Sequence, residues 1–269
     1  MSNEIHEIWL DPKDKILYGE YSVRGNYFAM RIETYIIAWN REDTIHLTIN
    51  HYKKLGAVIL YDNFSDDRTR EIAEKLGAEV RVFGKVGELD DQAYIDVKNH
   101  CWKHSQADYV IVVDEDEILY HPHLDLFLAN ALDNGCTIIR PQGFNIHSDE
   151  MPVSDWLEIK RGENNENYSK VCVFSPLHIK EIGYRWGCHA CRPMGNIVYG
   201  PAGLHLLHYR DVGGVERLIE RHRLYQGRLS EFNKKFNLGH HYSETEADKR
   251  KQWKDFSERS VILSEAGLL

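Results

Sequence analysis

The first half of the chain alternates short apolar runs with segments in which apolar residues recur every three or four positions. Uninterrupted runs such as "AVILYD" predict strands covered on both faces, and the helical spacing predicts helices between them. Strands are predicted at 34–43 (polar from Asn40), 57–63, 78–84 and 108–114, and helices at 43–56, 66–77 and 90–105. This alternation indicates an α/β fold, with a mostly parallel sheet flanked by helices.

The second half of the chain has a mixed pattern. Strands or strand ends are predicted at 136–144, 170–176, 177–184 and 204–211, with a loop-rich stretch at 145–170. A basic amphipathic helix is predicted at 214–236. No low-complexity linker separates the two halves, so both are assigned to one continuous domain.

Four consecutive acids, Asp114 to Glu117, stand between two apolar stretches. A solvated turn after a strand is the simplest explanation for such a run. Its position argues for more, because ligands of open α/β sheets bind at the carboxyl ends of the strands. Clustered carboxylates repel one another unless a cation neutralises them, and Mg²⁺ and Mn²⁺ prefer oxygen ligands. The run therefore predicts a site for Mn²⁺ or Mg²⁺.

Composition and charge narrow the function further. The 269 residues are 42% hydrophobic and 28% charged, which suits a globular protein with a sizeable core. A net charge of −9 argues against nucleic acid as a partner. No apolar stretch reaches the ~20 residues of a transmembrane segment, and "MSNEIHEIWLDPKDK" lacks the apolar core of a signal peptide, so a cytoplasmic location is expected. Five cysteines, an odd number, argue against a disulfide framework.

Glycine-rich phosphate loops are missing from the sequence. Neither GxGxxG nor GxxxxGK[ST] follows a predicted strand, which argues against a dehydrogenase or a P-loop enzyme. Polar residues instead follow three of the strands, in "WNRED", "DNFSDDRT" and "DEDE". Because the carboxyl ends of parallel strands meet at one edge of a sheet, these residues are expected to converge on one ligand.

In this order, the three stretches resemble the motifs of GT-A fold glycosyltransferases of the family 2 type. An Asn-Arg-Glu turn, a D[ND]xSxDxT loop and a DxD motif are typical of that group, and "YSKVCVFSP", "GCHACRPMG" and "LLHYRD" resemble blocks of its second half. With the pattern above, the resemblance implies an N-terminal arm or hairpin at 1–30, a nucleotide-binding half at 31–125, an acceptor-side half at 126–240 and a helical tail at 241–269.

The resemblance also implies roles for individual residues. Asp114 and Asp116 fit the DxD pair, although Glu115 and Glu117 have the same spacing. His208 is the expected further metal ligand, with a hydrogen-bonded core histidine as the alternative. Contacts to the nucleotide-sugar are expected from Trp39, Asn40, Asp62, Asn63, Asp114, Lys170 and His189.

The implied function is metal-dependent transfer of a sugar from a nucleotide-sugar to a glycan or another hydroxyl acceptor, by an inverting mechanism. A UDP-sugar is the default donor, and GDP- and dTDP-sugars are the alternatives. Asp149 and Glu150, in a loop after the metal motif, are the expected candidates for the base that deprotonates the acceptor. Two other functions stay open: a metal-dependent nucleotidyl or phosphoryl transferase, and a non-catalytic module that binds nucleotide-sugars.

Overall fold

The computed structural model describes residues 30–269. Residues 31–269 form one compact unit. Residues 1–29, and with them nearly all of the predicted N-terminal arm or hairpin, lie outside the described part.

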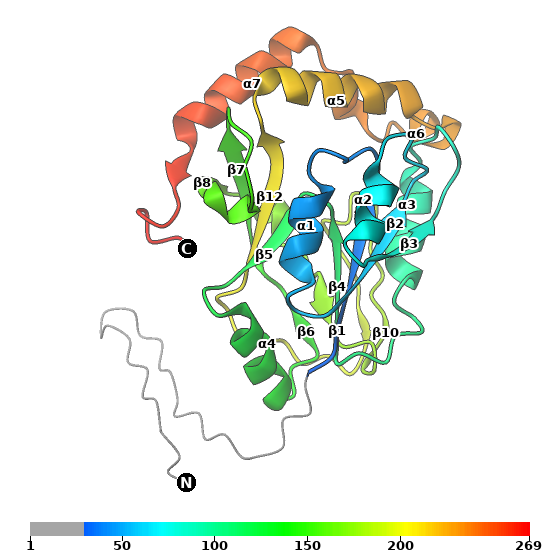
Figure 1. Cartoon of the computed structure of the whole chain (residues 1–269), viewed down its shortest axis with the longest axis vertical. Coiled ribbons are helices and arrows are strands. Elements are labelled where there is room, and N and C mark those ends of the chain that lie inside the picture. The colour runs from blue at the N-terminus through cyan, green and yellow to red at the C-terminus, as the bar shows by residue number, and fades with distance from the viewer. Residues whose placement is uncertain (1–29) are drawn as a thin grey trace. The chain divides into compact units, whose positions relative to one another are not determined.

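A six-stranded sheet occupies the centre of this unit (Figure 1). Its order is β3 (Glu79–Val82), β2 (Ala57–Asp62), β1 (Ile32–Ala38), β4 (Tyr109–Asp114), β9 (Val173–Phe174) and β6 (Ile138–Ile139). The first four strands are parallel, and β9 runs antiparallel to both β4 and β6. The four predicted strands of the first half and the mostly parallel sheet are thus confirmed.

Helices connect the parallel strands as predicted. They are α1 (Ile45–Tyr52), α2 (Thr69–Lys75) and α3 (Asp91–His100), and α4 (Leu124–Asp133) follows later in the chain. The Asp90 side chain caps α3 by accepting the N–H groups of Gln92 and Ala93. Apolar side chains of the strands form the core beneath these helices, and Ile36, Leu60 and Ile111 are fully buried.

A second, five-stranded sheet lies beside the first one. Its order is β13 (Val261–Ile262), β8 (Arg161–Asn164), β7 (Gln142–Ser148), β12 (His205–Val212) and β5 (Glu117–Tyr120). Only Glu115 and Asp116 separate the end of β4 from the start of β5. The acidic run is therefore the turn by which the chain leaves one sheet and enters the other.

The stretch 145–170, predicted to be loop-rich, contains most of β7 and all of β8. Two 3₁₀ turns, η1 (Trp156–Glu158) and η2 (Glu166–Tyr168), lie between and after these strands. Two short strands, β10 (Ile179–Glu181) and β11 (Met194–Gly195), pair with each other as a separate small sheet.

Helices of the last third of the chain cross the upper end of both sheets in Figure 1. They are α5 (Val215–Arg228), α6 (Glu231–Lys235) and α7 (Glu246–Arg259), with a 3₁₀ turn η3 (His240–Ser243) before α7. The prediction of one continuous helix at 214–236 is wrong, because α5 ends at Arg228 and α6 begins at Glu231. Leu229 leaves the helical conformation at ψ 122°, and the Ser230 side chain then caps α6.

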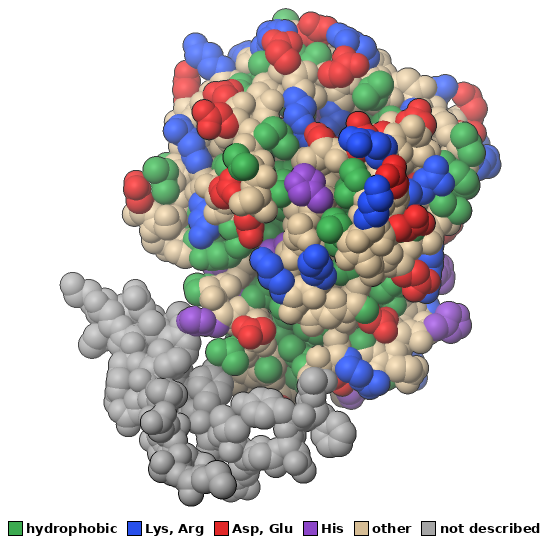
Figure 2. Space-filling view, in the orientation of Figure 1, with side chains coloured by type: hydrophobic (Ala, Val, Ile, Leu, Met, Phe, Trp, Pro, Cys, Tyr) green, Lys and Arg blue, Asp and Glu red, His purple; other side chains and the backbone are tan. Residues whose placement is uncertain are grey.

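Figure 2 shows acidic and basic side chains interspersed over the visible face, so the acids of this face are not gathered into one patch. No helix within residues 30–269 is long and apolar enough to cross a membrane.

Candidate active site

A cavity of about 360 Å³ opens at the carboxyl ends of β1 and β4. These two strands are neighbours in the sheet, and β2 and β3 lie on the far side of β1. Ligands of open α/β sheets bind where the strand order reverses in this way. The cavity, called the central cavity below, is walled by side chains from both sheets, α3 and α5.

The backbone explains why β1 ends at the cavity. Asn40 adopts φ 48°, a left-handed conformation that asparagine tolerates better than most residues. The Asn40 amide group reaches the Asp66 loop, donating to Asp66 Oδ1 and accepting from Asp66 N–H. The sharp turn leaves Trp39 on the cavity wall and sends Arg41 toward the acidic run.

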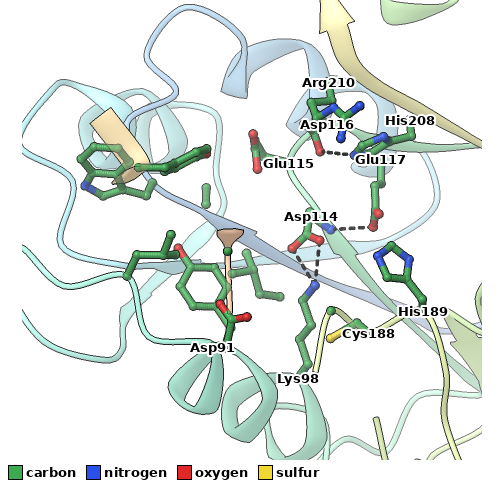
Figure 3. Close-up of a pocket in the computed structure, with 18 of the residues that line it drawn as sticks. Asp91, Lys98, Asp114, Glu115, Asp116, Glu117, Cys188, His189, His208 and Arg210 are labelled. Carbon is green, nitrogen blue, oxygen red and sulfur yellow. Dashed lines mark hydrogen bonds and ion pairs between the residues drawn. The ribbon is translucent and has the colours of Figure 1, made fainter. Parts of the chain in front are cut away.

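Each carboxylate of the acidic run faces a buried basic side chain. Lys98 binds Asp114 at 2.7 Å (Figure 3), Arg41 binds Glu115, and Lys170 binds Glu117. The guanidinium of Arg221 lies 3.7 Å from Asp116. Four acids and four bases thus neutralise one another inside the protein, which is why the run tolerates burial.

Burial and these neighbours have opposite effects on the carboxylates. Burial would raise the pKa of Asp114, but Lys98 and Lys170 outweigh it and lower that pKa to about 2. Burial raises the pKa of Glu115 to about 7, although Arg41 opposes the shift. Asp114 is therefore ionised at pH 7, whereas the pKa of Glu115 lies near 7 even though Arg41 and Arg221 both favour its charged form.

Asp116 and His208 face each other across the top of the cavity. The Nε2 atom of His208 lies 3.6 Å from Asp116 Oδ1, while its Nδ1 lies 3.0 Å from Asn145 Oδ1. Burial lowers the pKa of His208, although Asp116 opposes this, so the ring is neutral at pH 7. In the tautomer with its proton on Nδ1, the ring donates to Asn145 Oδ1 and turns the Nε2 lone pair toward the Asp116 carboxylate.

Two acceptors that face each other in a buried position call for a cation between them. Metal-binding histidines usually donate their other ring N–H to a neighbouring oxygen, and Asn145 Oδ1 lies in that position beside His208 Nδ1. Asp116 and His208 therefore fit a divalent metal. Within residues 30–269 no group of three or more His, Cys, Asp or Glu side chains is arranged to hold one, so the further ligands must come from the substrate or water. The role of Asp114 as a metal ligand stays a prediction, because its carboxylate is bound to lysines.

Six of the predicted site residues line the central cavity: Trp39, Asp114, Asp116, Lys170, His189 and His208. The indole of Trp39 lies beneath the guanidinium of Arg228, 3.5 Å from the ring centre. The His189 ring donates its Nδ1–H to the backbone carbonyl of Asn167 at 2.6 Å. The structure therefore brings together residues that are up to 169 positions apart in the sequence.

Three other predicted residues, Asn40, Asp62 and Asn63, do not line the cavity. The carboxylate of Asp62 is fully buried and accepts from the N–H and the hydroxyl of Ser65. Asn40 binds the Asp66 loop, and Asn63 accepts a hydrogen bond from Arg228 at 2.6 Å. Asp62 and Asn63 have almost no exposed surface, whereas Asn40 is half-buried, and the contact of all three to a nucleotide stays a prediction.

Asp149 and Glu150, the predicted bases, line a different cavity together with His147 and Lys160. Asp149 accepts the indole N–H of Trp253 at 3.2 Å. The structure does not bring these two acids to the acidic run, because they follow the end of β7 at Ser148, which pairs with Val212, four positions beyond His208 on β12.

Several residues of the central cavity have no obvious signal in the sequence. Lys98 lies in the last turn of α3, and Arg221, His222 and Tyr225 belong to the helix that was predicted only as basic and amphipathic. Asp91 also lines the cavity; it accepts an amide N–H from Asn233 at 3.0 Å, and burial raises its pKa.

Comparison with known families identifies the class of protein. Residues 34–179, more than half of the chain, match the sequence profile described as glycosyl transferase family 2. The chain therefore belongs to the glycosyl transferase family 2. No curated protein gives a significant match.

Solved structures resemble parts of the chain. Glucosyl-3-phosphoglycerate synthase from Mycobacterium tuberculosis, in complex with Mn²⁺, UDP and glucosyl-3-phosphoglycerate, is 22% identical, with 44% of each chain covered and a TM-score of 0.31. S. aureus TarS is 15% identical over 73% of this chain and 39% of its own, with a TM-score of 0.43. The chain thus spans less than half the length of these proteins.

Proposed function

We propose that this protein transfers a sugar from a nucleotide-sugar to a hydroxyl acceptor with the help of Mn²⁺ or Mg²⁺. The observation that carries the proposal is the pair Asp116 and His208, whose facing acceptors lie 3.6 Å apart at the switch point of the sheet. Membership of glycosyl transferase family 2 supports the reaction class. A UDP-sugar is the proposed donor, and an inverting mechanism is the proposed course.

Asp116 and His208 would hold the metal, and Asp114 is the second proposed aspartate ligand. When bound, the metal would supply Lewis-acid stabilisation of the negative charge on the leaving diphosphate. Lys98 and Lys170, both about 6% exposed at the side chain, place two further positive charges on the same wall. Phosphate oxygens that enter the cavity would meet these ammonium groups.

The charge balance of the cavity supports joint binding of metal and nucleotide. The four carboxylates of the acidic run already face four basic side chains. A divalent cation alone would leave an excess of positive charge in a buried site, which is costly. The diphosphate of a nucleotide offsets that excess, so each ligand favours the other.

A base must remove the proton of the acceptor hydroxyl. Asp149 and Glu150 were the candidates from the sequence, and they would act only on an acceptor that reaches their separate cavity. We propose Asp91 as a third candidate. It lines the central cavity, its carboxylate has an amide partner instead of an ion pair within the described residues, and burial raises its pKa.

A thermal-shift experiment tests the donor. UDP-glucose, GDP-glucose and dTDP-glucose are added with and without Mn²⁺, because a ligand that binds the folded state raises the melting temperature. The proposal expects the largest rise with the UDP-sugar and Mn²⁺ together. A nucleotidyl transferase would instead respond to a nucleoside triphosphate, and equal shifts with and without metal would contradict the metal-dependent reaction.

A further inference from the structure

Two neighbouring polar side chains on α5 are buried at the wall of the central cavity without full hydrogen bonding. Arg221 is 8% exposed and His222 is 5% exposed. Within residues 30–269, Arg221 Nε and both ring nitrogens of His222 have no hydrogen-bond partner. Buried polar groups in folded proteins nearly always have a partner, so three unpaired atoms on one wall indicate a ligand.

The contacts of Arg221 within residues 30–269 leave its Nε atom without a hydrogen-bond partner. Its Nη2 group donates to the backbone carbonyl of Arg210 at 3.2 Å and lies 3.7 Å from Asp116. Neither contact involves Nε, which carries its own N–H. A guanidinium presents its donors in a planar fork, and that geometry suits phosphate or carboxylate oxygens.

The surroundings of His222 are positively charged. Burial, followed by Arg210, Arg221 and Lys249, lowers the pKa of His222 to about 3. The ring is therefore neutral at pH 7 and offers one N–H donor beside the arginines. The carboxylate nearest to Arg210 is Asp211, which Arg210 binds with two hydrogen bonds of 3.1 and 2.9 Å. Within residues 30–269, Arg221 comes no closer than 3.7 Å to a carboxylate, that of Asp116, and Lys249 makes no ion pair, so an anion fits this wall.

The same wall borders a second space. Arg210, His222 and His241 also line a cavity of about 310 Å³ beneath α7. The ring of His222 packs against Tyr242 and His241 of η3, with centroids 5.2 and 5.9 Å away. His222 therefore lines both the central cavity and the cavity beneath α7.

We propose that Arg221 and His222 bind a phosphate group of a substrate. Two sources have this chemistry, the diphosphate of the donor and a phosphate carried by the acceptor. Naming a substrate as the source rests on the proposed function, whereas the binding of phosphate itself does not.

Calorimetry with inorganic phosphate tests the site in the metal-free, full-length protein. Wild type is expected to bind phosphate saturably, and Arg221→Gln and His222→Leu are each expected to weaken binding by about tenfold or more, since each removes a donor to a charged ligand. Arg223→Gln is the matched control. Arg223 lies on the same helix, pairs with Glu220 at the surface, and its loss changes the net charge by the same amount as the loss of Arg221.

The results separate the site from general attraction of anions. Unchanged binding in Arg223→Gln together with weakened binding in His222→Leu, a variant that keeps the charge at pH 7, supports the site. No saturable binding by wild type, or an equal loss in Arg221→Gln and Arg223→Gln, would overturn it. The melting temperature of each variant shows that it is folded.

A repeat with saturating UDP and Mn²⁺ distinguishes the two sources. If phosphate binds with the same affinity beside UDP, the site holds a phosphate of the acceptor. If UDP and Mn²⁺ abolish phosphate binding, the site holds the diphosphate of the donor. A protein that binds phosphate at Arg221 but transfers no sugar would refute the proposed function and leave this site standing.

Discussion

Lys98 binds both carboxylate oxygens of Asp114, with its Nζ atom 2.7 Å from each. Asp114 is the first aspartate of the proposed metal motif, and a buried ammonium group already neutralises it. Metal binding therefore has to compete with an internal cation. The nucleotide changes this balance, because its phosphates give the lysine another negative partner.

Replacing Lys98 with methionine tests this competition. Lys98→Met removes the positive charge and keeps most of the side-chain volume, so the affinity for Mn²⁺ without nucleotide is expected to rise. The affinity for UDP is expected to fall, because the phosphates lose a positive neighbour. Calorimetric titrations of each ligand measure both effects. Lys103→Met is the control, since Lys103 pairs with Glu181 outside the cavity. A lower affinity of Lys98→Met for Mn²⁺ alone would disprove the competition.

The pair of His208 and Asn145 predicts a pH dependence. A metal binds only the neutral imidazole, and burial lowers the pKa of His208 below its usual 6.5. Mn²⁺ affinity should therefore be constant near pH 7 and fall only at more acidic pH, as the ring takes up a proton. Asn145→Ala removes the acceptor of the other ring N–H and should weaken Mn²⁺ binding by about 10- to 100-fold. His205→Ala, on the same strand, should not; identical losses in the two variants would argue against a metal at His208.

The buried pair Arg41 and Glu115 predicts a loss of stability. Both side chains are nearly inaccessible to solvent, at 5% and 7% exposure. Arg41→Met leaves the Glu115 carboxylate without a partner and should reduce the free energy of unfolding by about 3–5 kcal/mol at pH 8. Urea denaturation measures the change. Arg68→Met breaks an exposed pair with Glu42 and should cost about 0–1 kcal/mol. If both substitutions lower the free energy of unfolding by the same amount, the buried pair of Arg41 and Glu115 does not stabilise the turn between β4 and β5.

Three carboxylates compete for the role of the base. Asp91→Asn is expected to lower kcat by about 10²- to 10⁴-fold and to leave UDP binding nearly unchanged, because a general base acts in the chemical step. Asp149→Asn and Glu150→Gln are expected to have kcat values close to that of wild type. The three variants are compared by steady-state kinetics with one donor and one acceptor. A large loss of kcat in Asp149→Asn or Glu150→Gln, with little change in Asp91→Asn, would show that the base lies in the loop after β7.

The first half of the fold follows from local sequence patterns. Each predicted strand and helix between residues 32 and 114 is present, because runs such as "YVIVV" have strong strand propensity and only fit a sheet covered on both faces. The convergence of Trp39 and Asp114 at one edge also follows, since parallel strands share the direction of their ends.

Local sequence patterns did not predict all the secondary structure of the second half. β8 has the sequence "RGEN", with no apolar alternation, and it forms through pairing with β7 and β13. The break at Leu229 depends on the cap that Ser230 supplies to α6. Tertiary contacts outweigh local propensity in both places.

The basic partners of the acidic run could not be predicted either, because their positions depend on tertiary structure. Arg41, Lys98, Lys170 and Arg221 come from four separate segments, and only the folded chain brings them to one turn. The sequence suggested a metal as the neutralising cation, and the structure adds four basic side chains that share this task. A lysine in a helix such as α3 carries no mark that it will be buried.

The most direct test of the central claim is a calorimetric titration of Mn²⁺ into wild type and Asp116→Ala, each saturated with UDP. Asp116 faces His208 at 3.6 Å, so its loss removes one of the two protein ligands proposed for the metal. The account predicts clear Mn²⁺ binding by wild type and a loss of at least about 100-fold in Asp116→Ala, since several kcal/mol depend on a metal ligand. Equal Mn²⁺ affinities in the two proteins would contradict it.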